Sequence, residues 1–421
     1  MSKPKLRFPE FAGDWVQHIL SDVIVDIADG PFGSNLKLEH YTDKKEARII
    51  QLSNLSDYGW QEENTRYTTF EHAEAIKRCI VNEDELIMGK MMPAGMTIMR
   101  PTTDKMYVLS SDCVRIKLDK STVTNGFFLY TTKSEEFLNQ IRSSSQGSTR
   151  IRTSISKIKN MNLNIPSLPE QHKIASLFTE LDNLIQSAEK ELEGYRELKQ
   201  GMLQKMFPKK GEKVPEIRFP EFTDDWEQRK VTELLKNSSS AMKIGPFGSA
   251  LKKEYFVEEG VKVYAQENAF TGDFSIGDYY ITEDKYKELK SCELYPGDLV
   301  ISMMGTIGAC AIFPKNAEKG IMNSHLLRLQ FNNEVIPEYI MYLLRDSVLI
   351  RKQIDRLSVG SIMSGLSSSV VKKLVFPIPK LAEQKRIAGY FENLDNLIVS
   401  QQQELDGYKE LKKGLLQQMF C

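Results

Sequence analysis

The sequence predicts a mixed α+β protein in which two α/β domains are separated by two long antiparallel helices. These helices are expected to form a coiled-coil spacer with a pseudo-two-fold internal repeat. Three observations predict this class. A unit of roughly 210 residues is written twice. Each copy ends in a proline-free stretch with an apolar heptad pattern, and short β-branched and apolar runs, typical of strands, occur in the rest of each copy.

The repeat is visible in motifs that keep their order. The segment Leu6–Trp15 (LRFPEFAGDW) recurs as Ile217–Trp226 (IRFPEFTDDW). The pentapeptide GPFGS starts at Gly30 and again at Gly245, and IPSLPEQ, which ends at Gln171, recurs as IPKLAEQ. The offset between the copies stays between 211 and 215 residues. A period this long indicates a duplicated domain pair and not a solenoid.

The last part of each copy predicts a long helix. Between Glu170 and Met206 there is no proline, and apolar residues or tyrosine recur every seven positions. About 37 residues give a helix of roughly 55 Å. Two like units in one chain favour a two-fold axis, which makes the two helices antiparallel. The predicted boundaries are 1–168 and 209–380 for the mixed domains, and 169–208 and 381–421 for the helices. Strands are expected at 48–53, 85–88, 107–109, 113–118, 261–264, 298–301 and 326–329, and single helices at 126–142 and 337–357.

Composition restricts the class of protein. The 421 residues have a net charge of −1, so nucleic-acid contacts have to come from local basic clusters. No apolar run approaches the roughly 18 residues of a membrane span. The five cysteines form no Cys-x-x-Cys pair, which is typical of reduced thiols in a cytosol. These features predict a cytoplasmic protein that has no contact with membranes.

No catalytic set is recognisable in the sequence. The phosphate-binding patterns G-x-x-x-x-G-K-[ST] and G-x-G-x-x-G do not occur. An Asn-Pro-Pro-aromatic run, expected of an amino-methyltransferase, and a clear nuclease carboxylate cluster do not occur either. The five histidines are scattered without metal-ligand spacing. We therefore expect no catalytic residue, no metal site and no cofactor bound by this chain.

Two windows without acidic residues predict contacts with DNA. Residues 137–169 and 356–382 contain no Asp or Glu but many Ser, Thr, Asn and basic residues. Cations mixed with hydroxyl and amide groups suit phosphate and base-edge contacts. An ordinary solvated loop is the alternative, although the recurrence of the window in both copies weakens it. The candidate residues are Gln146, Ser148, Thr149, Arg150 and Arg152 in the first window, and Ser361 and Ser364 in the second.

Further candidates follow the repeated glycine loop and two strands. The glycines of GPFGS allow close backbone approach, and the free N–H groups and serine could bind phosphate; a plain structural turn is equally compatible. Asn and Gln side chains after a strand can pair with adenine. The segments between 55 and 132 match their counterparts poorly, so the copies are expected to share a scaffold and to read different sequences. The candidates are Gly33, Ser34, Lys37, Gln51, Asn54 and Lys90 in the first copy, and Gly248, Ser249, Lys252, Gln266 and Asn268 in the second.

These motifs resemble the specificity subunit of type I restriction–modification systems over the whole chain. The resemblance depends on R-F-P-E-F-x-x-x-W, on G-P-F-G-S, and on the Gly-Ser turns at Gly147 and Gly360. It depends most on I-P-x-L-x-E-Q-x-x-I-A, which leads into each predicted long helix. The resemblance implies two target-recognition domains (1–168 and 209–380) that read a bipartite, asymmetric DNA target. It also implies a helical spacer that sets the gap between the half-sites.

The resemblance further implies partners and cofactors. Two methyltransferase subunits would dock on the helices and domains and bring S-adenosylmethionine, and restriction/translocase subunits would bring ATP and magnesium. The specificity chain itself would bind double-stranded DNA and catalyse nothing. Two alternatives remain: an adaptor whose helices merely dimerise, which does not explain the acid-free windows, and a free-standing nuclease or methyltransferase, which lacks its catalytic set.

Overall fold

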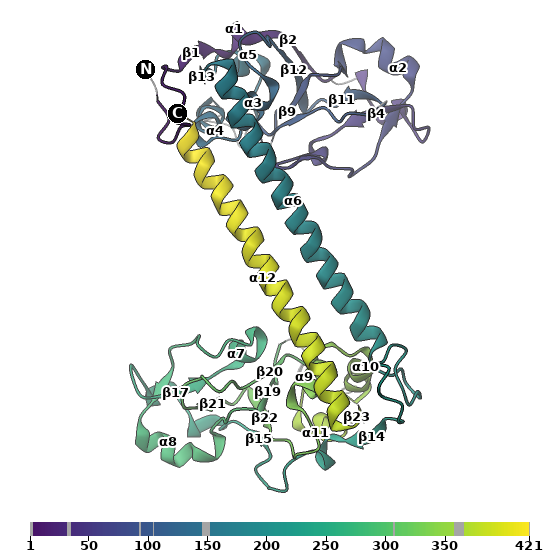
Figure 1. Cartoon of the computed structure of the whole chain (residues 1–421), viewed down its shortest axis with the longest axis vertical. Helices are drawn as coiled ribbons and strands as arrows, with labels where there is room; N and C mark the ends of the chain where they lie inside the picture. The colour runs from purple at the N-terminus through teal and green to yellow at the C-terminus, as the bar shows by residue number, and fades with distance from the viewer. Residues whose placement is uncertain are drawn as a thin grey trace. The chain divides into compact units, whose positions relative to one another are not determined.

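The computed structural model describes residues 3–31, 35–91, 94–103, 105–144, 152–305, 308–357 and 366–420. The chain forms two compact units (Figure 1). Unit 1 comprises residues 1–191 and 401–421, and unit 2 comprises residues 192–400. Each unit therefore takes part of both long helices, so the units do not coincide with the linear boundaries drawn from the sequence.

Unit 1 contains two larger sheets and two short strand pairs. The larger sheets have the strand orders β10-β9-β12-β2 and β3-β7-β4-β11-β8. Within the second sheet β11 runs parallel to β4. The pair β1–β13 joins the beginning of the domain to its end. The strands are β1 (Val16–Ile19), β2 (Ile24–Asp29), β3 (Tyr41–Thr42), β4 (Ala47–Ile50), β5 (Leu55–Ser56), β6 (Gly59–Trp60), β7 (Tyr67–Thr68), β8 (Ile80–Val81), β9 (Leu86–Gly89), β10 (Thr97–Met99), β11 (Met106–Leu109), β12 (Cys113–Leu118) and β13 (Asn162–Ile165).

Short helices of unit 1 begin at hydroxyl caps. The side chains of Thr69, Thr124 and Ser154 each accept a hydrogen bond from a backbone N–H of the first helical turn. The single helix expected at 126–142 is wrong, because the helix breaks near Ser134, whose hydroxyl accepts from Phe137 N–H. The helices are α1 (Leu20–Val23), η2 (Leu38–His40), η3 (Leu52–Asn54), α2 (Phe70–Ala75), η4 (Lys77–Cys79), α3 (Asn125–Thr131), α4 (Glu135–Ser144) and α5 (Ile155–Lys159).

Unit 2 repeats this topology with one strand fewer in its second sheet. Its orders are β15-β22-β19-β20 and β16-β18-β17-β21, with the pair β14–β23. The parallel pair β17–β21 corresponds to β4–β11 of unit 1. The strands are β14 (Glu227–Lys230), β15 (Met242–Ile244), β16 (Phe256–Val257), β17 (Val261–Tyr264), β18 (Tyr280–Ile281), β19 (Leu299–Ser302), β20 (Cys310–Ile312), β21 (Gly320–Met322), β22 (Leu326–Leu329) and β23 (Val375–Ile378).

The helices of unit 2 use equivalent caps. Thr282 and Ser367 accept first-turn N–H groups as Thr69 and Ser154 do in unit 1. The single helix expected at 337–357 is also broken, at Ser347, whose backbone is extended (φ −78°, ψ 123°). The helices are η5 (Val231–Glu233), η6 (Gly248–Ala250), η7 (Lys253–Tyr255), α7 (Gln266–Thr271), α8 (Glu283–Leu289), η8 (Lys290–Cys292), α9 (Pro337–Asp346), α10 (Val348–Leu357) and α11 (Ser368–Val371).

The two long helices are α6 (Leu168–Lys205) and α12 (Leu381–Met419). In unit 1 they run antiparallel, because Asp182 of α6 pairs with Lys412 of α12 while the later Glu189 pairs with the earlier Lys409. Neither helix is apolar enough to cross a membrane, and the same holds for every other helix in the part of the chain that the structure describes.

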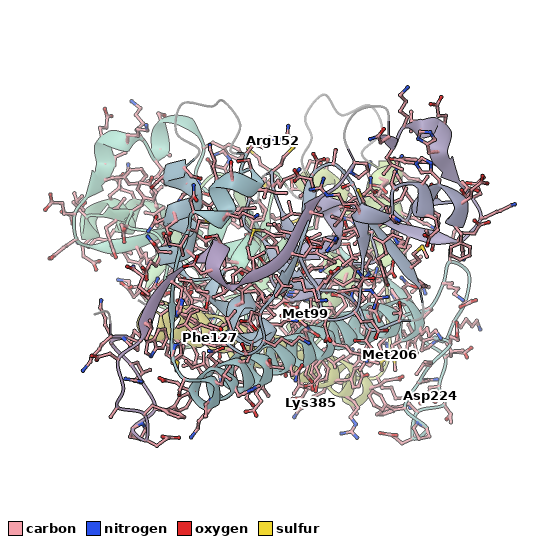
Figure 2. All side chains as sticks on the ribbon, turned by 90° about the horizontal axis from the view of Figure 1, so that it is seen from above. Met99, Phe127, Arg152, Met206, Asp224 and Lys385 are labelled. Atoms are coloured by element: carbon pink, nitrogen blue, oxygen red, sulfur yellow. The ribbon has the colours of Figure 1, made fainter. Side chains whose placement is uncertain are left out.

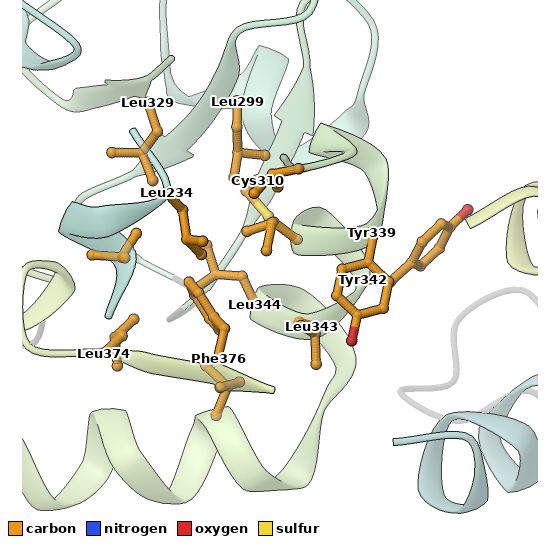
Figure 3. Packing of buried hydrophobic residues seen from close by; sticks show 14 of the residues in the cluster. Leu234, Leu299, Cys310, Leu329, Tyr339, Tyr342, Leu343, Leu344, Leu374 and Phe376 are labelled. Atoms are coloured by element: carbon orange, nitrogen blue, oxygen red, sulfur yellow. The ribbon is translucent and has the colours of Figure 1, made fainter. Parts of the chain in front are cut away.

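Each unit buries its own apolar cores. In unit 2, strands, helices and the long helices together bury a large cluster that includes Leu299, Tyr339 and Phe376 (Figure 3). Phe207, just after the end of α6, belongs to this cluster, and its ring stacks on Phe391 at 5.8 Å. Phe420, just after the end of α12, belongs to the equivalent cluster of unit 1. Each long helix therefore begins in one unit and ends in the core of the other.

Candidate nucleic-acid interface

The repeated RFPEF motif fastens each unit to a long helix. In unit 1 the guanidinium of Arg7 donates two hydrogen bonds to the carboxylate of Glu170, at 2.6 and 2.8 Å. In unit 2 Arg218 donates to Glu383 in the same way, at 2.7 Å for both bonds. Both carboxylates have side chains only 1% exposed. Charge-assisted, bidentate pairs of this kind are strong and directional, so the motif has a structural role.

The Gln of the IPxLxEQ motif is a second fastening point. Gln171 accepts from Thr124 N–H and donates to the carbonyls of Thr122 and Pro166. Gln384 makes the equivalent three bonds in unit 2, to Ile336 N–H and to the carbonyls of Glu334 and Pro379. Both glutamines are fully buried. The RFPEF and IPxLxEQ motifs, which carry much of the family resemblance, are therefore scaffold contacts.

The GPFGS loop combines a packed glycine with exposed residues. A Cβ at Gly245 would lie 1.8 Å from the carbonyl oxygen of Asn323, and Gly30 has the same 1.8 Å approach to Ser110. Gly248 has φ +55°, a conformation that favours glycine. Ser249 is exposed. Gly33 and Ser34 lie outside the described residues.

The two lysines that follow the loop occupy equivalent, exposed positions. The side chains of Lys37 and Lys252 are 53% and 50% exposed. Each has an acidic neighbour two residues later, at 3.7 Å for Glu39 and 3.4 Å for Glu254. Exposed pairs of this kind are weak, so both ammonium groups remain available for a phosphate.

The predicted base contacts of Asn54 and Asn268 do not fit the structure. Asn54 is 0% exposed and Asn268 is 1% exposed. Each side-chain oxygen accepts a backbone N–H three residues earlier, and each amide donates to two carbonyls of the following loop. All the amide's hydrogen-bonding groups are used, so these residues shape the loop and present no edge to a base.

The glutamines and Lys90 are also only partly available. Gln51 and Gln266 are half-buried, and the hydrogen-bond pattern aligns Gln51 with Ala265 and not with Gln266. Lys90 is 2% exposed and its ammonium lies 2.7 Å from Asp29. Burial with a paired carboxylate leaves Lys90 no surface from which to contact a phosphate.

Arg152 is the candidate DNA contact of the first acid-free window that lies within the described residues. It is exposed and its backbone bridges to Met91. Figure 2 shows it at the edge of unit 1 away from Phe127, which packs against the end of α12 through Phe420 at 5.7 Å. The other candidates from both windows, Gln146, Ser148, Thr149, Arg150, Ser361 and Ser364, lie outside the described residues.

A buried polar cluster was not predicted from the sequence. In unit 1 the hydroxyl of Tyr130 donates to Asp182 at 2.9 Å, and Lys412 of the antiparallel helix pairs with the same carboxylate. Burial raises the pKa of Tyr130 above its usual value. Burial, and then the nearby charge of Lys412, lower the pKa of Lys133 to about 8.

Unit 2 repeats the cluster with Tyr342, Asp395 and Lys199. The signal was available in the sequence, because the aspartates and the lysines recur at one constant offset. A comparison of polar positions between the two copies would have found them.

The described residues contain no cluster of three or more His, Cys, Asp or Glu side chains that could hold a metal ion. Cys79, Cys113, Cys292 and Cys310 are buried free thiols. Burial raises the pKa of Cys113 and of Cys310 to about 12, so neither thiol is a nucleophile near neutral pH.

Two units that share their scaffold contacts and differ in the segments between them define a duplicated recognition protein. The family model for the type I restriction modification DNA specificity domain matches residues 36–194 and 223–407, more than half of the chain. The chain therefore belongs to this family, the non-catalytic DNA-recognition components of type I restriction–modification systems.

Known relatives are similar to this chain over most of its length. The type I restriction enzyme MjaVIII specificity subunit of Methanocaldococcus jannaschii is 26% identical over 350 residues, which cover 81% of this chain and 79% of the relative. The crystal structure of the type I system S subunit from M. genitalium aligns with a TM-score of 0.61 at 15% identity, covering 100% of this chain and 99% of that one. A structure described for complex assembly and conformational transition of the type I system aligns with a TM-score of 0.54 at 15% identity, covering 97% of both chains.

Proposed function

We propose that this chain reads a bipartite, asymmetric DNA target, one half-site with each unit, and positions methyltransferase and restriction subunits on it. One observation carries the proposal: the arginine and glutamine contacts that fasten each unit to the long helices are duplicated, while the segments between them differ. Unit 1 has a β5–β6 hairpin where unit 2 has α7. A shared scaffold with unlike segments suits two readers of different sequence.

The long helices are proposed to set the distance between the half-sites. Half-sites one helical turn of DNA apart, roughly 34 Å, lie on the same face of the duplex. The same helices and the adjoining domains would dock two methyltransferase subunits, with S-adenosylmethionine bound there. ATP and magnesium would be bound by the restriction/translocase subunits. Such a complex would act in the cytoplasm, where the DNA is.

The candidate DNA contacts are the exposed positions, namely Arg152, Lys37, Lys252 and Ser249, together with the acid-free windows. Phosphate contacts release counterions, so they predict an affinity that falls steeply with salt. The test is a binding titration of the chain, assembled with its methyltransferase partner, on random duplex DNA at several salt concentrations, followed by selection of the bound sequences. We expect two conserved half-sites separated by a fixed gap.

A variant lacking seven residues, about two turns, from both α6 and α12 should select the same half-sites with an altered gap. Binding that is insensitive to salt, or a selection with no preferred sequence, would contradict DNA recognition. An unaltered gap in the shortened variant would contradict only the role of the helices in spacing.

A further inference from the structure

The GPFGS loop has the same sequence in both copies, and its phenylalanine in unit 2 is exposed. Phe247 is 66% exposed, and no aromatic or cationic side chain among the described residues stacks on its ring. The first copy carries Phe32 at the same place in the motif, outside the described residues. A phenylalanine with two thirds of its surface exposed contributes little to a core, so its repetition points to a role other than packing.

Backbone geometry explains the two glycines of the loop, but it does not explain the exposed Phe247 and Ser249. Gly245 is required by the close approach of Asn323, and Gly248 by its positive φ. The hydroxyl of Ser249 is exposed and has no hydrogen-bond partner within the described part of the chain. Phe247 and Ser249 therefore form an unpartnered apolar and polar pair at the tip of a rigid turn.

The identity of the two loops constrains what they contact. The segments expected to read bases differ between the units, because each half-site has its own sequence. A loop that is the same in both units must contact something that both half-sites share. In duplex DNA, the shared features are the phosphates and the stacking faces of the bases, which carry no sequence information by themselves.

The charge around the loop favours DNA over a second protein. From Ala241 to Lys253 the chain has three lysines, Lys243, Lys252 and Lys253, and no acidic residue. An apolar side chain flanked by cations and a hydroxyl is the arrangement with which DNA-bending proteins insert a wedge between base pairs while holding the adjacent phosphates.

Resting on the proposed function, we infer that Phe247 inserts its ring between bases of the DNA duplex and stacks there, as a sequence-independent anchor of unit 2. Ser249 and Lys252 hold the phosphates beside the insertion. The divergent segments then read the sequence from a register that this anchor fixes.

The test uses the chain assembled with its methyltransferase partner and two duplexes, one with the selected target and one without it. Phe247→Ala should weaken binding to both duplexes by the same factor, about 5- to 100-fold, the usual effect of losing one aromatic–base stack. The ratio of the two affinities should not change. Phe247→Trp should retain most of the affinity. The comparison variant is Phe270→Ala, which removes an exposed phenylalanine (41%) from α7, in the segment that differs between the units. Any loss of binding in this variant should be larger on the target duplex and so change the ratio of the two affinities.

A spectroscopic readout reports the insertion itself. With 2-aminopurine placed at each purine of the second half-site in turn, the wild-type complex should unstack at least one position and raise its fluorescence. Phe247→Ala should abolish this rise in fluorescence. Phe247→Trp should keep the rise, because the indole ring can insert in the same place.

Three results would overturn the inference: an affinity within twofold of wild type, a loss confined to the target duplex, or a loss of the methyltransferase subunit from the complex. The last result would show that the loop contacts the protein partner. Failure of the proposed function is distinguishable, because the wild-type complex would then fail to prefer its target duplex.

Discussion

The two units differ in the segment that follows the buried asparagine of each. In unit 1 the amide of Asn54 reaches a carbonyl seven residues later, and the intervening chain forms the β5–β6 hairpin. In unit 2 the amide of Asn268 reaches a carbonyl only five residues later, and the chain forms the end of α7. Each amide also bonds a second carbonyl, nine residues later in unit 1 and eight in unit 2. The loop-shaping bonds are the same, but the chain inside the first bond is two residues longer in unit 1 and forms a hairpin there.

That hairpin ties unit 1 to its helices. Gln186 of α6 donates to the carbonyl of Tyr58 at 3.0 Å, and Lys412 of α12 lies 5.0 Å from the Tyr58 ring. A cavity of about 460 Å³ borders Tyr58 in unit 1, and the cavity beside Phe270, Tyr342 and Arg345 in unit 2 is larger, at about 670 Å³. The duplication therefore preserved the fastening of each domain to the scaffold, and unit 1 adds a second tie from the segment after Asn54 to the helices.

The largest expected effect tests the shared fastening. Arg218→Ala leaves the buried carboxylate of Glu383 without its cation and should lower the free energy of unfolding of unit 2 by about 3–5 kcal/mol. Arg7→Ala should cost unit 1 less, because Trp15 Nε1 still donates to Glu170 at 3.3 Å.

In unit 2 the equivalent Trp226 Nε1 is buried without a hydrogen-bond partner among the described residues. Urea unfolding followed by tryptophan fluorescence measures both losses. Arg386→Ala, which removes an exposed arginine near Glu221, is the control and should cost under about 1 kcal/mol. Equal losses of unfolding free energy in Arg7→Ala and Arg218→Ala would show that the Trp15 hydrogen bond does not compensate for the lost arginine.

The next effect concerns the helix-to-helix ion pairs. Lys412 and Asp182 are 8% and 11% exposed, whereas Lys199 and Asp395 are 17% and 33% exposed. Lys412→Ala should therefore cost a few kcal/mol, because a nearly buried carboxylate loses its main cation. Lys199→Ala should cost closer to about 1 kcal/mol. Thermal unfolding of the two variants at matched salt decides; a larger loss for Lys199→Ala would reverse the comparison.

Lys133 makes the stability of unit 1 depend on pH. Its pKa of about 8 lies below the ordinary lysine value of 10.5, because burial and the charge of Lys412 disfavour the ammonium. The unfolded chain therefore binds more protons between these two values, so stability rises as the pH increases from about 8 to 10.5. Below about pH 8 the charged form is a constant destabilising contribution. Lys133→Met should stabilise unit 1 at pH 7 and remove this rise; an unchanged pH profile would contradict the shift.

The tie made by Tyr58 should contribute modestly. Tyr58→Ala removes its contacts with the two lysines of α12, each worth about 0.5–1 kcal/mol. Hydrogen exchange of residues 55–60 should become faster, while exchange in β4 and β11 stays as in wild type. Phe270→Ala in unit 2 is the matched variant, and it should leave the exchange of the long helices unchanged. Unaltered exchange in the hairpin would show that its own strand pairing is sufficient.

The smallest expected effect is on DNA affinity, and it should be the same in both units. Lys37→Ala and Lys252→Ala should each lower DNA affinity slightly and reduce the slope of log affinity against log salt by about 1. Equal changes would support equivalent phosphate contacts in the two units. A change in sequence preference, with the slope intact, would assign the lysine to base reading.

Much of the fold could be predicted from the sequence because the two copies of the repeat can be compared with each other. The repeat, the strands at 113–118 and 326–329, and the extents of the long helices followed from periodicity and from motifs found twice. The candidate contacts were harder to predict. Gln, Asn and Lys after a strand suggest DNA reading, yet Asn54, Asn268 and Lys90 are buried. Residue type cannot distinguish an amide that caps a loop from one that faces a base.

The sequence alone determined that two like units share one scaffold and differ between their motifs, since identity between copies survives wherever packing demands it. Only the tertiary structure decided what each shared residue does. It revealed that Arg7 and Arg218 pair with buried glutamates, that each long helix ends in the core of the other unit, and that Phe247 is exposed. The physical reason is that burial and pairing depend on residues brought together from distant parts of the chain, and the local sequence does not record them.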